Sequence, residues 1–230
     1  MPDSSRGRRF YDRQASSYDR RWRHYQAATH QALLARLNGS FHRVLDVGCG
    51  TGTFLERLLE RYPAAEGIGV DTSDGMLAVA RRRLAGYDAD LRRADACWLP
   101  LPRHSVDLVT LASVLHYLRC PSAALREAGR VLRPGSTVGI VDYVPRTGTG
   151  SFLDGLIRLY DPGHARCRGL DELCRLTIHA GLTVIHAESF PIDHLFRGEL
   201  VLARAPIPDT RQERNVPLMD LAYFSSRPPK

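Results

Sequence analysis

The stretch from Val44 to Thr53, which reads VLDVGCGTGT, constrains the fold of this chain more than any other. Its first four residues are apolar except for Asp46, as expected of a short buried strand with one acid near its carboxyl end. Glycines follow at positions 48, 50 and 52, where the missing side chains permit unusual backbone angles and close approach by a ligand. Apolar residues then recur at helical spacing: Phe54, Leu55, Leu58, Leu59 and Tyr62. A strand, a glycine turn and a helix N-terminus suit a polar or anionic group, because free amides and the helix dipole point outward.

A second acid follows at the spacing of a β-α-β unit. Gly67 to Val70 is the next expected strand, and Asp71 ends it about 20 residues after the glycines. A carboxylate here suits a ribose, because it accepts hydrogen bonds from both hydroxyls of a cis-diol. The glycine pattern departs from the G-x-G-x-x-G of dinucleotide-binding folds, since Thr53 or Leu55 stands where the third glycine would be.

The composition is that of an ordinary globular chain. Its 230 residues fit one domain, and no apolar run approaches the roughly 18 residues of a membrane span. The N-terminus lacks the apolar core of a signal peptide, and five cysteines at irregular spacing form no zinc pattern. We therefore expect reduced thiols, no metal and a cytoplasmic protein.

The formal net charge is +7, and almost all of the positive charge comes from arginine, since Lys230 is the only lysine. Seven arginines cluster within the first 23 residues: Arg6, Arg8, Arg9, Arg13, Arg20, Arg21 and Arg23. Such a basic arm can meet nucleic acid, an anionic membrane surface or an acidic substrate, but the solvated face of a helix is the favoured interpretation.

Four segments carry a family resemblance. The D-x-G-x-G-x-G loop resembles the nucleotide-binding loop of class I S-adenosylmethionine-dependent methyltransferases. The strings LPLPRHSVDLVTLASVLHYL and REAGRVLRPGS resemble the segments around the fourth strand and before the fifth in that family. The N-terminal phrase FYDRQASSYDRRW resembles the lid of the ubiquinone/menaquinone-biosynthesis type. Apart from the lid, the resemblance covers about residues 40 to 145, and a pair of expected strands near the end of the chain extends it to about 205.

The resemblance implies an α/β fold: a Rossmann-like, doubly wound seven-stranded sheet in the order 3-2-1-4-5-7-6, with only strand 7 antiparallel. We expect an N-terminal arm and helical lid at 1–37, a methyltransferase domain at 38–205 with a substrate-side insert at 145–169, and a Pro-rich tail at 206–230. Residues 1–9 are expected to be disordered, followed by one or two helices from Phe10 to Leu37. Further helices are expected to begin at Leu115 and at Pro121, the latter broken by Pro134-Gly135, and to run from Phe152 to Tyr160.

The resemblance also assigns candidate site residues. Those expected to bind S-adenosylmethionine, and its product S-adenosylhomocysteine, are Tyr18, Asp46, Gly48, Gly50, Asp71, Thr72, Met76, Asp95, Ala96 and Ala112. Those expected to line the acceptor site are Tyr11, His116, Tyr143, Tyr160 and His164. For several of these a plainer interpretation stays open: core packing for the lid tyrosines and Met76, a turn residue for Asp95 and a surface residue for His164.

The expected chemistry is methyl transfer from a sulfonium to a small-molecule acceptor, an in-line substitution dominated by proximity and exclusion of water. A general base is not obligatory, although phenols or amines benefit from one. The candidates are His116 and Tyr143, then Asp142 and His164, while His116 can also simply pack beneath the cofactor loop.

Two alternatives remain. One is a methyltransferase of RNA or another macromolecule that uses the Arg-rich arm, although the chain shows no aromatic-basic platform or added recognition domain. The other is a non-catalytic subunit with the same fold. The acceptor and the oligomeric state are not legible in the sequence.

Overall fold

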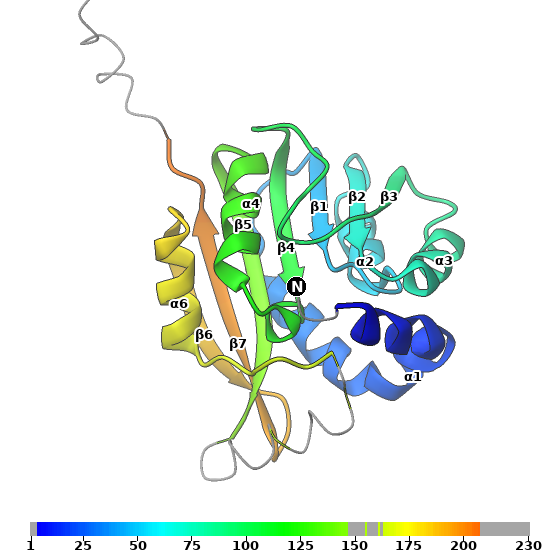
Figure 1. The fold of residues 1–230 in the computed structure, drawn as a ribbon. Helices are drawn as coiled ribbons and strands as arrows, with labels where there is room; N and C mark the ends of the chain where they lie inside the picture. The colour runs from blue at the N-terminus through cyan, green and yellow to red at the C-terminus, as the bar shows by residue number, and fades with distance from the viewer. Residues whose placement is uncertain (1–3, 147–154, 156–160, 162, 208–230) are drawn as a thin grey trace, which may run out of the picture.

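The fold is a single seven-stranded sheet with helices on both faces (Figure 1). The computed structural model describes residues 4–146, 155, 161 and 163–207. The strand order is β3-β2-β1-β4-β5-β7-β6, and β7 pairs antiparallel with both of its neighbours while the other pairs are parallel. This order and the single antiparallel strand confirm the predicted fold class.

Buried apolar runs form the central strands, because a sheet covered on both faces excludes water from both sides of each of them. The two edge strands, β3 and β6, are partly exposed along their whole length. The strands are β1 (Arg43–Val47), β2 (Glu66–Asp71), β3 (Ala89–Arg93), β4 (Val106–Ala112), β5 (Leu132–Pro145), β6 (Thr183–Pro191) and β7 (Phe196–Arg204). In β1, Val44, Leu45 and Val47 are at most 1% exposed. Asp46 is therefore a buried acid among apolar neighbours in this strand.

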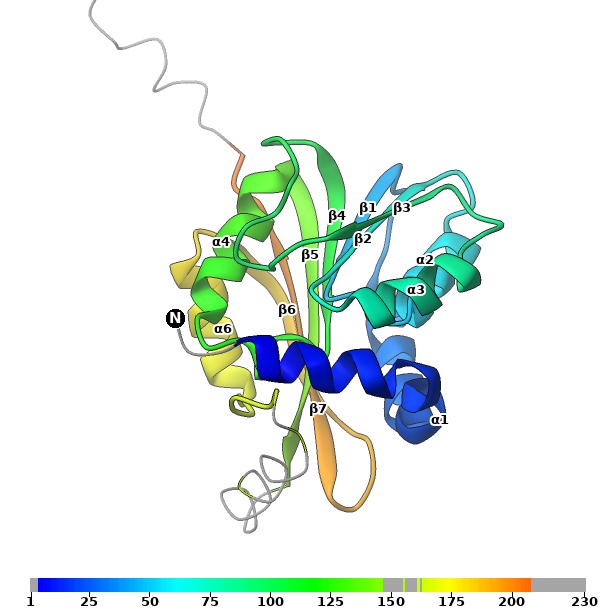
Figure 2. The ribbon, with the colours of Figure 1, turned by 45° about the vertical axis from the view of Figure 1, so that its right-hand side comes forward.

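The helices divide between the two faces of the sheet (Figure 2). Their bounds are α1 (Ser4–Arg36), α2 (Thr53–Arg61), α3 (Asp74–Arg83), the 3₁₀ turn η1 (Leu115–Tyr117), α4 (Pro121–Val131) and α6 (Leu170–His179). The end of α1 and α2 pack into one core with the sheet, and α4 and α6 pack into a second core on the opposite face. Each face is thus sealed by at least two helices.

Helix α1 crosses the end of the sheet where the parallel strands finish, and its ribbon changes direction on the way (Figures 1 and 2). Its last turns are anchored in the core, where Leu33 and Leu37 are at most 1% exposed. An added Cβ at Gly139 of β5 would lie 2.9 Å from Leu33 Cδ1, so this glycine makes room for the helix. Within the described chain, no helix has the length and apolarity needed to cross a membrane.

Four local expectations need correction. Residues 4–9 are helical rather than disordered, because they continue α1. The segment after β4 forms only the 3₁₀ turn η1, and α4 ends at Val131, before the expected break. Strand β5 begins at Leu132 and runs through Pro134-Gly135, where Gly135 adopts φ +77°. Residues 206 and 207 apart, the expected tail lies outside the described residues, as does the expected helix Phe152–Tyr160 except for Gly155.

Candidate functional site

The glycine loop is held by the strand beside it. The amides of Gly48 and Cys49 both donate to Val70 O, at 2.7 and 3.0 Å. Gly48 adopts φ +69° and Gly50 adopts φ +53°, the left-handed region that favours glycine. An added Cβ at Gly48 would lie 2.5 Å from Val114 Cγ2, whereas at Gly50 it would meet nothing within 4 Å. Gly48 is therefore required by packing, while Gly50 presents bare backbone to open space.

Asp71 ties the loop to the end of β2. Its Oδ2 accepts from the Gly50 amide at 2.9 Å, and its Oδ1 accepts from the Ser73 amide at 2.8 Å. Burial raises the pKa of Asp71, and these amides offset part of that rise. Because a carboxylate has about four lone-pair sites, two bonds leave acceptor capacity for a ligand's hydroxyls.

Asp46 lies at the end of β1, next to this loop. It is 2% exposed, and its Oδ1 accepts from Thr110 Oγ1 at 2.7 Å. Burial raises the pKa of Asp46 to about 7, and the charge of Asp71 adds to the rise. The sheet thus brings Asp46, Gly48, Gly50 and Asp71 together, at the point where strand order reverses between β1 and β4. We call this group of four residues the cofactor corner.

The remaining candidates for the cofactor surround that corner unevenly. Thr72 is exposed, and Met76 is buried in the first turn of α3, where its amide donates to the capping Ser73 Oγ at 3.1 Å. Asp95 is exposed and accepts from the Cys97 amide at 2.8 Å, which closes a turn, while the next residue, Ala96, is buried. Ala112 is the last residue of β4.

Two aspartates of α1, which sequence reasoning did not single out, fasten this helix over the loop. Asp12 Oδ1 accepts from Ser73 Oγ at 2.6 Å and from the Gly75 amide at 2.9 Å, at the N-terminus of α3. Asp19 accepts from Thr51 Oγ1 and from Arg83 Nη2, both at 2.5 Å. The signal for them was present in the sequence, because each follows a tyrosine in FYDRQASSYDRRW and they stand seven residues, or two helical turns, apart.

The tyrosines of α1 point to a second group of side chains. Tyr11 donates from its hydroxyl to Asp161 Oδ2 at 2.5 Å, and its ring contacts those of Tyr18 and Tyr117 with centroids 6.0 and 5.3 Å apart. Burial raises the pKa of Tyr18, and the charges of Asp161 and Asp71 add to the rise. Tyr18 therefore lies between the cofactor corner and this aromatic group.

His116 and Asp142 form a buried pair on neighbouring strand ends. His116 is in η1 after β4, Asp142 is in β5, and each is 2% exposed. The His116 Nδ1 and Asp142 Oδ1 atoms lie 2.6 Å apart, and the His116 amide donates to Asp142 Oδ2 at 3.0 Å. His116 Nε2 is buried and has no hydrogen-bond partner among the described residues.

Aromatic rings surround the imidazole of His116. Its centroid lies 3.9 Å from that of Tyr117, 4.7 Å from that of Tyr143 and 5.5 Å from that of His164. Tyr143 also contacts Tyr25 of α1, with centroids 4.9 Å apart. Burial raises the pKa of Tyr143 well above its usual value, so its hydroxyl is a donor at neutral pH.

The segment 163–168 closes this group from outside. His164 is 6% exposed, so the surface position considered from sequence is wrong. The amides of Ala165 and Arg166 donate to His116 O at 2.8 and 3.1 Å. Tyr160, the remaining expected acceptor residue, lies outside the described residues.

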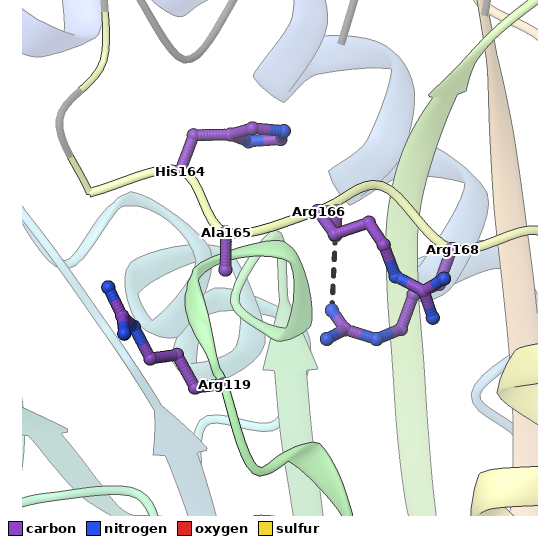
Figure 3. A pocket seen from close by; sticks show the side chains of 5 residues that line it. All are labelled: Arg119, His164, Ala165, Arg166 and Arg168. Atoms are coloured by element: carbon purple, nitrogen blue, oxygen red, sulfur yellow. Dashed lines mark hydrogen bonds between the residues drawn. The ribbon is translucent and has the colours of Figure 1, made fainter. Parts of the chain in front are cut away.

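A surface hollow of about 450 Å³ lies on the same segment (Figure 3). Its lining is strongly basic: Arg119, His164, Ala165, Arg166 and Arg168. Arg168 is 6% exposed and donates through Nη1 to Leu115 O at 2.5 Å and through Nη2 to Leu118 O at 2.9 Å. The hollow is thus joined to η1, the turn that carries His116.

The fold agrees with comparisons to known proteins. A family described as "Methyltransferase domain" matches residues 44–135. A demethylmenaquinone methyltransferase of Chlamydia pneumoniae is 33% identical over 141 residues, which are 60% of this chain and 61% of that protein. The ubiquinone/menaquinone biosynthesis C-methyltransferase UbiE of Desulfotalea psychrophila is 30% identical over 182 residues, covering 78% of this chain and 71% of that one.

Among solved structures, a chain of the complex that contains the Haloferax volcanii Trm112 methyltransferase activator superposes with a TM-score of 0.72. It is 22% identical, and the match covers 85% of this chain and 97% of that chain. At this identity the likeness concerns the fold alone. The first of the curated relatives are matched over only 52 to 61% of their own length.

Proposed function

This chain belongs to the class I S-adenosylmethionine-dependent methyltransferases of the ubiquinone/menaquinone-biosynthesis type, and from that premise we propose that it methylates a small aromatic acceptor. The single observation that carries the proposal is the corner formed by Gly48, Gly50, Asp46 and Asp71, with α1 fastened across it.

The residues of this corner fit S-adenosylmethionine. Gly50 presents backbone with open space where a side chain would stand, which permits close approach by a ligand. Asp71 keeps acceptor capacity for the ribose hydroxyls. The Asp95 carboxylate and the Ala96 amide, on the turn after β3, would hold the adenine, and Met76 would pack against it.

The cofactor supplies a methyl group bound to a sulfonium sulfur. The nucleophile of the acceptor would bond to that methyl group and displace the sulfur in line. The task of the protein is then to orient the acceptor and to exclude water. Helix α1 serves both purposes, because Asp12 and Asp19 bind it to the rim of the cofactor corner while Tyr11 binds it to Asp161 on the acceptor side.

An aromatic acceptor is supported by the side chains beyond the corner. Tyr25 and Phe196 both contact the ring of Tyr143 edge-on, with centroids 4.9 and 5.5 Å away. Offset and edge-to-face contacts of this kind suit a flat ring. The relatives named above, which act in menaquinone and ubiquinone biosynthesis, support the same class of acceptor.

The experiment that tests the proposal is calorimetric titration of S-adenosylmethionine and S-adenosylhomocysteine into the protein and into Asp71→Asn. We expect micromolar binding by the intact protein and an affinity about 10- to 100-fold lower in the variant, because a hydrogen bond to a charged group contributes about 1.5–3 kcal/mol. Asp74→Asn is the matched control, since Asp74 is an exposed acid three residues further on, paired with Arg93.

A second measurement concerns the acceptor. The protein is incubated with a cell extract and methyl-labelled cofactor, and the label is followed into small molecules, RNA and protein. Label in an organic-soluble aromatic fraction supports the proposal. Label that enters only macromolecules, or intact protein that binds neither form of the cofactor, contradicts it.

A further inference from the structure

We infer that His116 accepts a proton from the methyl acceptor through Nε2, and that Asp142 positions it for this task; this assigns the acceptor to ring systems with an ionisable hydroxyl. The inference rests on the proposed function and adds to it a proton acceptor and a class of substrate.

The contact with Asp142 fixes the orientation of the His116 imidazole. A carboxylate accepts hydrogen bonds and cannot donate them when ionised, so the 2.6 Å contact places a proton on Nδ1, facing Asp142 Oδ1. In a neutral imidazole the other nitrogen is then bare, which makes Nε2 the basic atom. Asp142 is itself fixed, because its Oδ1 also accepts from the Tyr143 amide at 2.9 Å and its Oδ2 from the His116 amide.

The Nε2 atom of His116 is buried and has no hydrogen-bond partner among the described residues. A buried polar atom without a partner is costly, and nearly all such atoms in native proteins are hydrogen-bonded. A ligand hydroxyl that donates to Nε2 would satisfy it, and this is the geometry that a general base requires.

Four ionisable side chains face the imidazole of His116 from the elements packed against it. These are Asp142 and Tyr143 from β5, Tyr117 from η1 and His164 from the segment after Asp161. Because Tyr143 and Tyr117 are buried phenols that keep their protons, neither competes with His116 as a base. Among these groups, only Asp142 faces His116 as a buried carboxyl in hydrogen-bond contact with its ring.

The hollow on the segment beside His116 is basic. Arg119, Arg166 and Arg168 line it, and the amides of this segment bind His116 O (Figure 3). Glu172 pairs with both Arg166 and Arg168. The hydroxyls of Tyr117 and Tyr143 beside His116 keep their protons, because burial and the charge of Asp161 raise their pKa values. Ionisation of a bound hydroxyl therefore depends on proton transfer to His116 itself.

The reaction moves one proton from the acceptor to His116. The acceptor O–H bond breaks and its proton moves to Nε2; the oxygen pair forms the new O–CH₃ bond as the S–CH₃ bond breaks, and that pair stays on sulfur. If a ring carbon conjugated to the oxygen attacks the methyl group instead, its electron pair forms the new C–CH₃ bond, that carbon then loses its own proton to water, and the oxygen regains the proton held by His116. Either route releases one proton overall.

The first test reads the tautomer without any substrate. Full-length protein labelled with ¹⁵N-histidine is examined by long-range ¹H–¹⁵N correlation at a pH where His116 is neutral, with His116→Gln to assign the signal. We expect a protonated Nδ1 and a bare Nε2 in the intact protein, and a loss of this preference in Asp142→Asn. A proton on Nε2 in the intact protein would overturn the inference.

The second test uses 4-nitrophenol, whose phenolate absorbs in the visible, bound to the protein loaded with S-adenosylhomocysteine. We expect its ionisation midpoint to fall by about one pH unit on binding, as a partner of opposite charge produces, and to return towards the free value in His116→Gln. His179→Gln, an exposed histidine on α6, is the matched control and should behave as the intact protein. No binding, or binding without a shift, would overturn the assignment of the acceptor class.

The third test separates chemistry from folding. With an acceptor from the labelled extract, His116→Gln should lower kcat by about 10²- to 10⁴-fold and abolish its acid limb, while affinity for S-adenosylhomocysteine stays unchanged. A loss of rate that merely follows the folded fraction in thermal unfolding would make the pair structural. Failure of the proposed function itself would appear differently, as absent cofactor binding, and would leave the tautomer result standing.

Discussion

Among single residues, Asp46 has a carboxyl group buried at the end of a strand, and this burial makes the stability of the fold depend on pH. Because burial raises its pKa to about 7, the folded protein holds a proton on Asp46 between about pH 4 and 7 that the unfolded chain has lost. The state that binds more protons is stabilised by acid, so this group makes the folded protein less stable as pH rises through that window.

Replacing Asp46 with Asn removes this penalty. The amide keeps an oxygen to accept from Thr110 Oγ1, so we expect the free energy of unfolding to rise by about 1–3 kcal/mol at pH 8 and to change little at pH 4. Urea unfolding of both proteins at the two pH values measures this. An equal difference at pH 4 and pH 8 would show that titration of Asp46 is not the cause.

The two glycines of the loop should respond differently to alanine. Gly48→Ala combines a left-handed backbone with a contact to Val114, so it should cost about 2–4 kcal/mol of stability. Gly50→Ala carries the backbone strain alone and should cost about 1–2 kcal/mol. Its methyl group stands where the cofactor would approach, so the larger effect should be on affinity. Urea unfolding and calorimetry on both variants measure the two effects, and equal losses of affinity per folded molecule would contradict the contrast.

Single residues of the cofactor corner were predictable because they follow one another along a β-α-β unit, so their spacing fixes their meeting point. The His116–Asp142 pair was not, although both residues were named as candidates. They lie 26 residues apart on different elements, and only the pairing of β4 with β5 brings them together. Asp161 was missed altogether, since a carboxylate in an irregular segment has no periodic signal.

At the scale of elements, α1 is fastened to the cofactor corner by polar contacts rather than by a broad apolar face. In Asp19→Asn the charge that binds Arg83 and Thr51 is lost, so the first half of α1 should open more often. We expect faster amide hydrogen exchange in residues 7–24 and several-fold faster release of S-adenosylhomocysteine, with little change in the unfolding midpoint.

Asp107→Asn is the control for that prediction. Asp107 is another carboxylate that accepts two hydrogen bonds, from the amides of His42 and Arg43, but at the amino end of β4, away from the corner. Its loss should leave exchange in α1 unchanged. If Asp107→Asn and Asp19→Asn accelerate exchange in α1 equally, the polar contacts of Asp19 do not hold the lid.

Element types were predictable from apolar periodicity, and their ends were not. Pro134-Gly135 reads as a helix terminator, yet α4 stops at Val131 and the same residues lie within β5. The bridge between Val106 and Leu132, ahead of a register shift, and the antiparallel partner β7 extend the strand in both directions. Such cross-strand contacts depend on residues distant in sequence, which local propensity does not contain.

At the scale of the whole molecule, the two halves of α1 belong to different parts of the structure. Ala15 is the one buried residue among 7–24, whereas Thr29, His30 and Leu33 in the second half are all at most 4% exposed. The second half therefore contributes to the core shared with α2, while the first half is held to the glycine loop and to the start of α3 through Asp12 and Asp19. In the proposed function, one helix thus joins the lid to the folded core.

This division predicts two kinds of destabilisation along one helix. Leu33→Ala removes a fully buried side chain that packs on Gly139, so it should lower the free energy of unfolding by about 2–4 kcal/mol and increase exchange throughout the sheet. Asp12→Ala removes the contacts to Ser73 and Gly75, and should raise exchange only in the first half of α1 and at the start of α3. Hydrogen exchange with and without S-adenosylhomocysteine distinguishes them, because the ligand should restore protection in Asp12→Ala more than in Leu33→Ala. If both variants loosen the same set of amides, α1 opens as one unit with the core, and closure over the site is inseparable from folding.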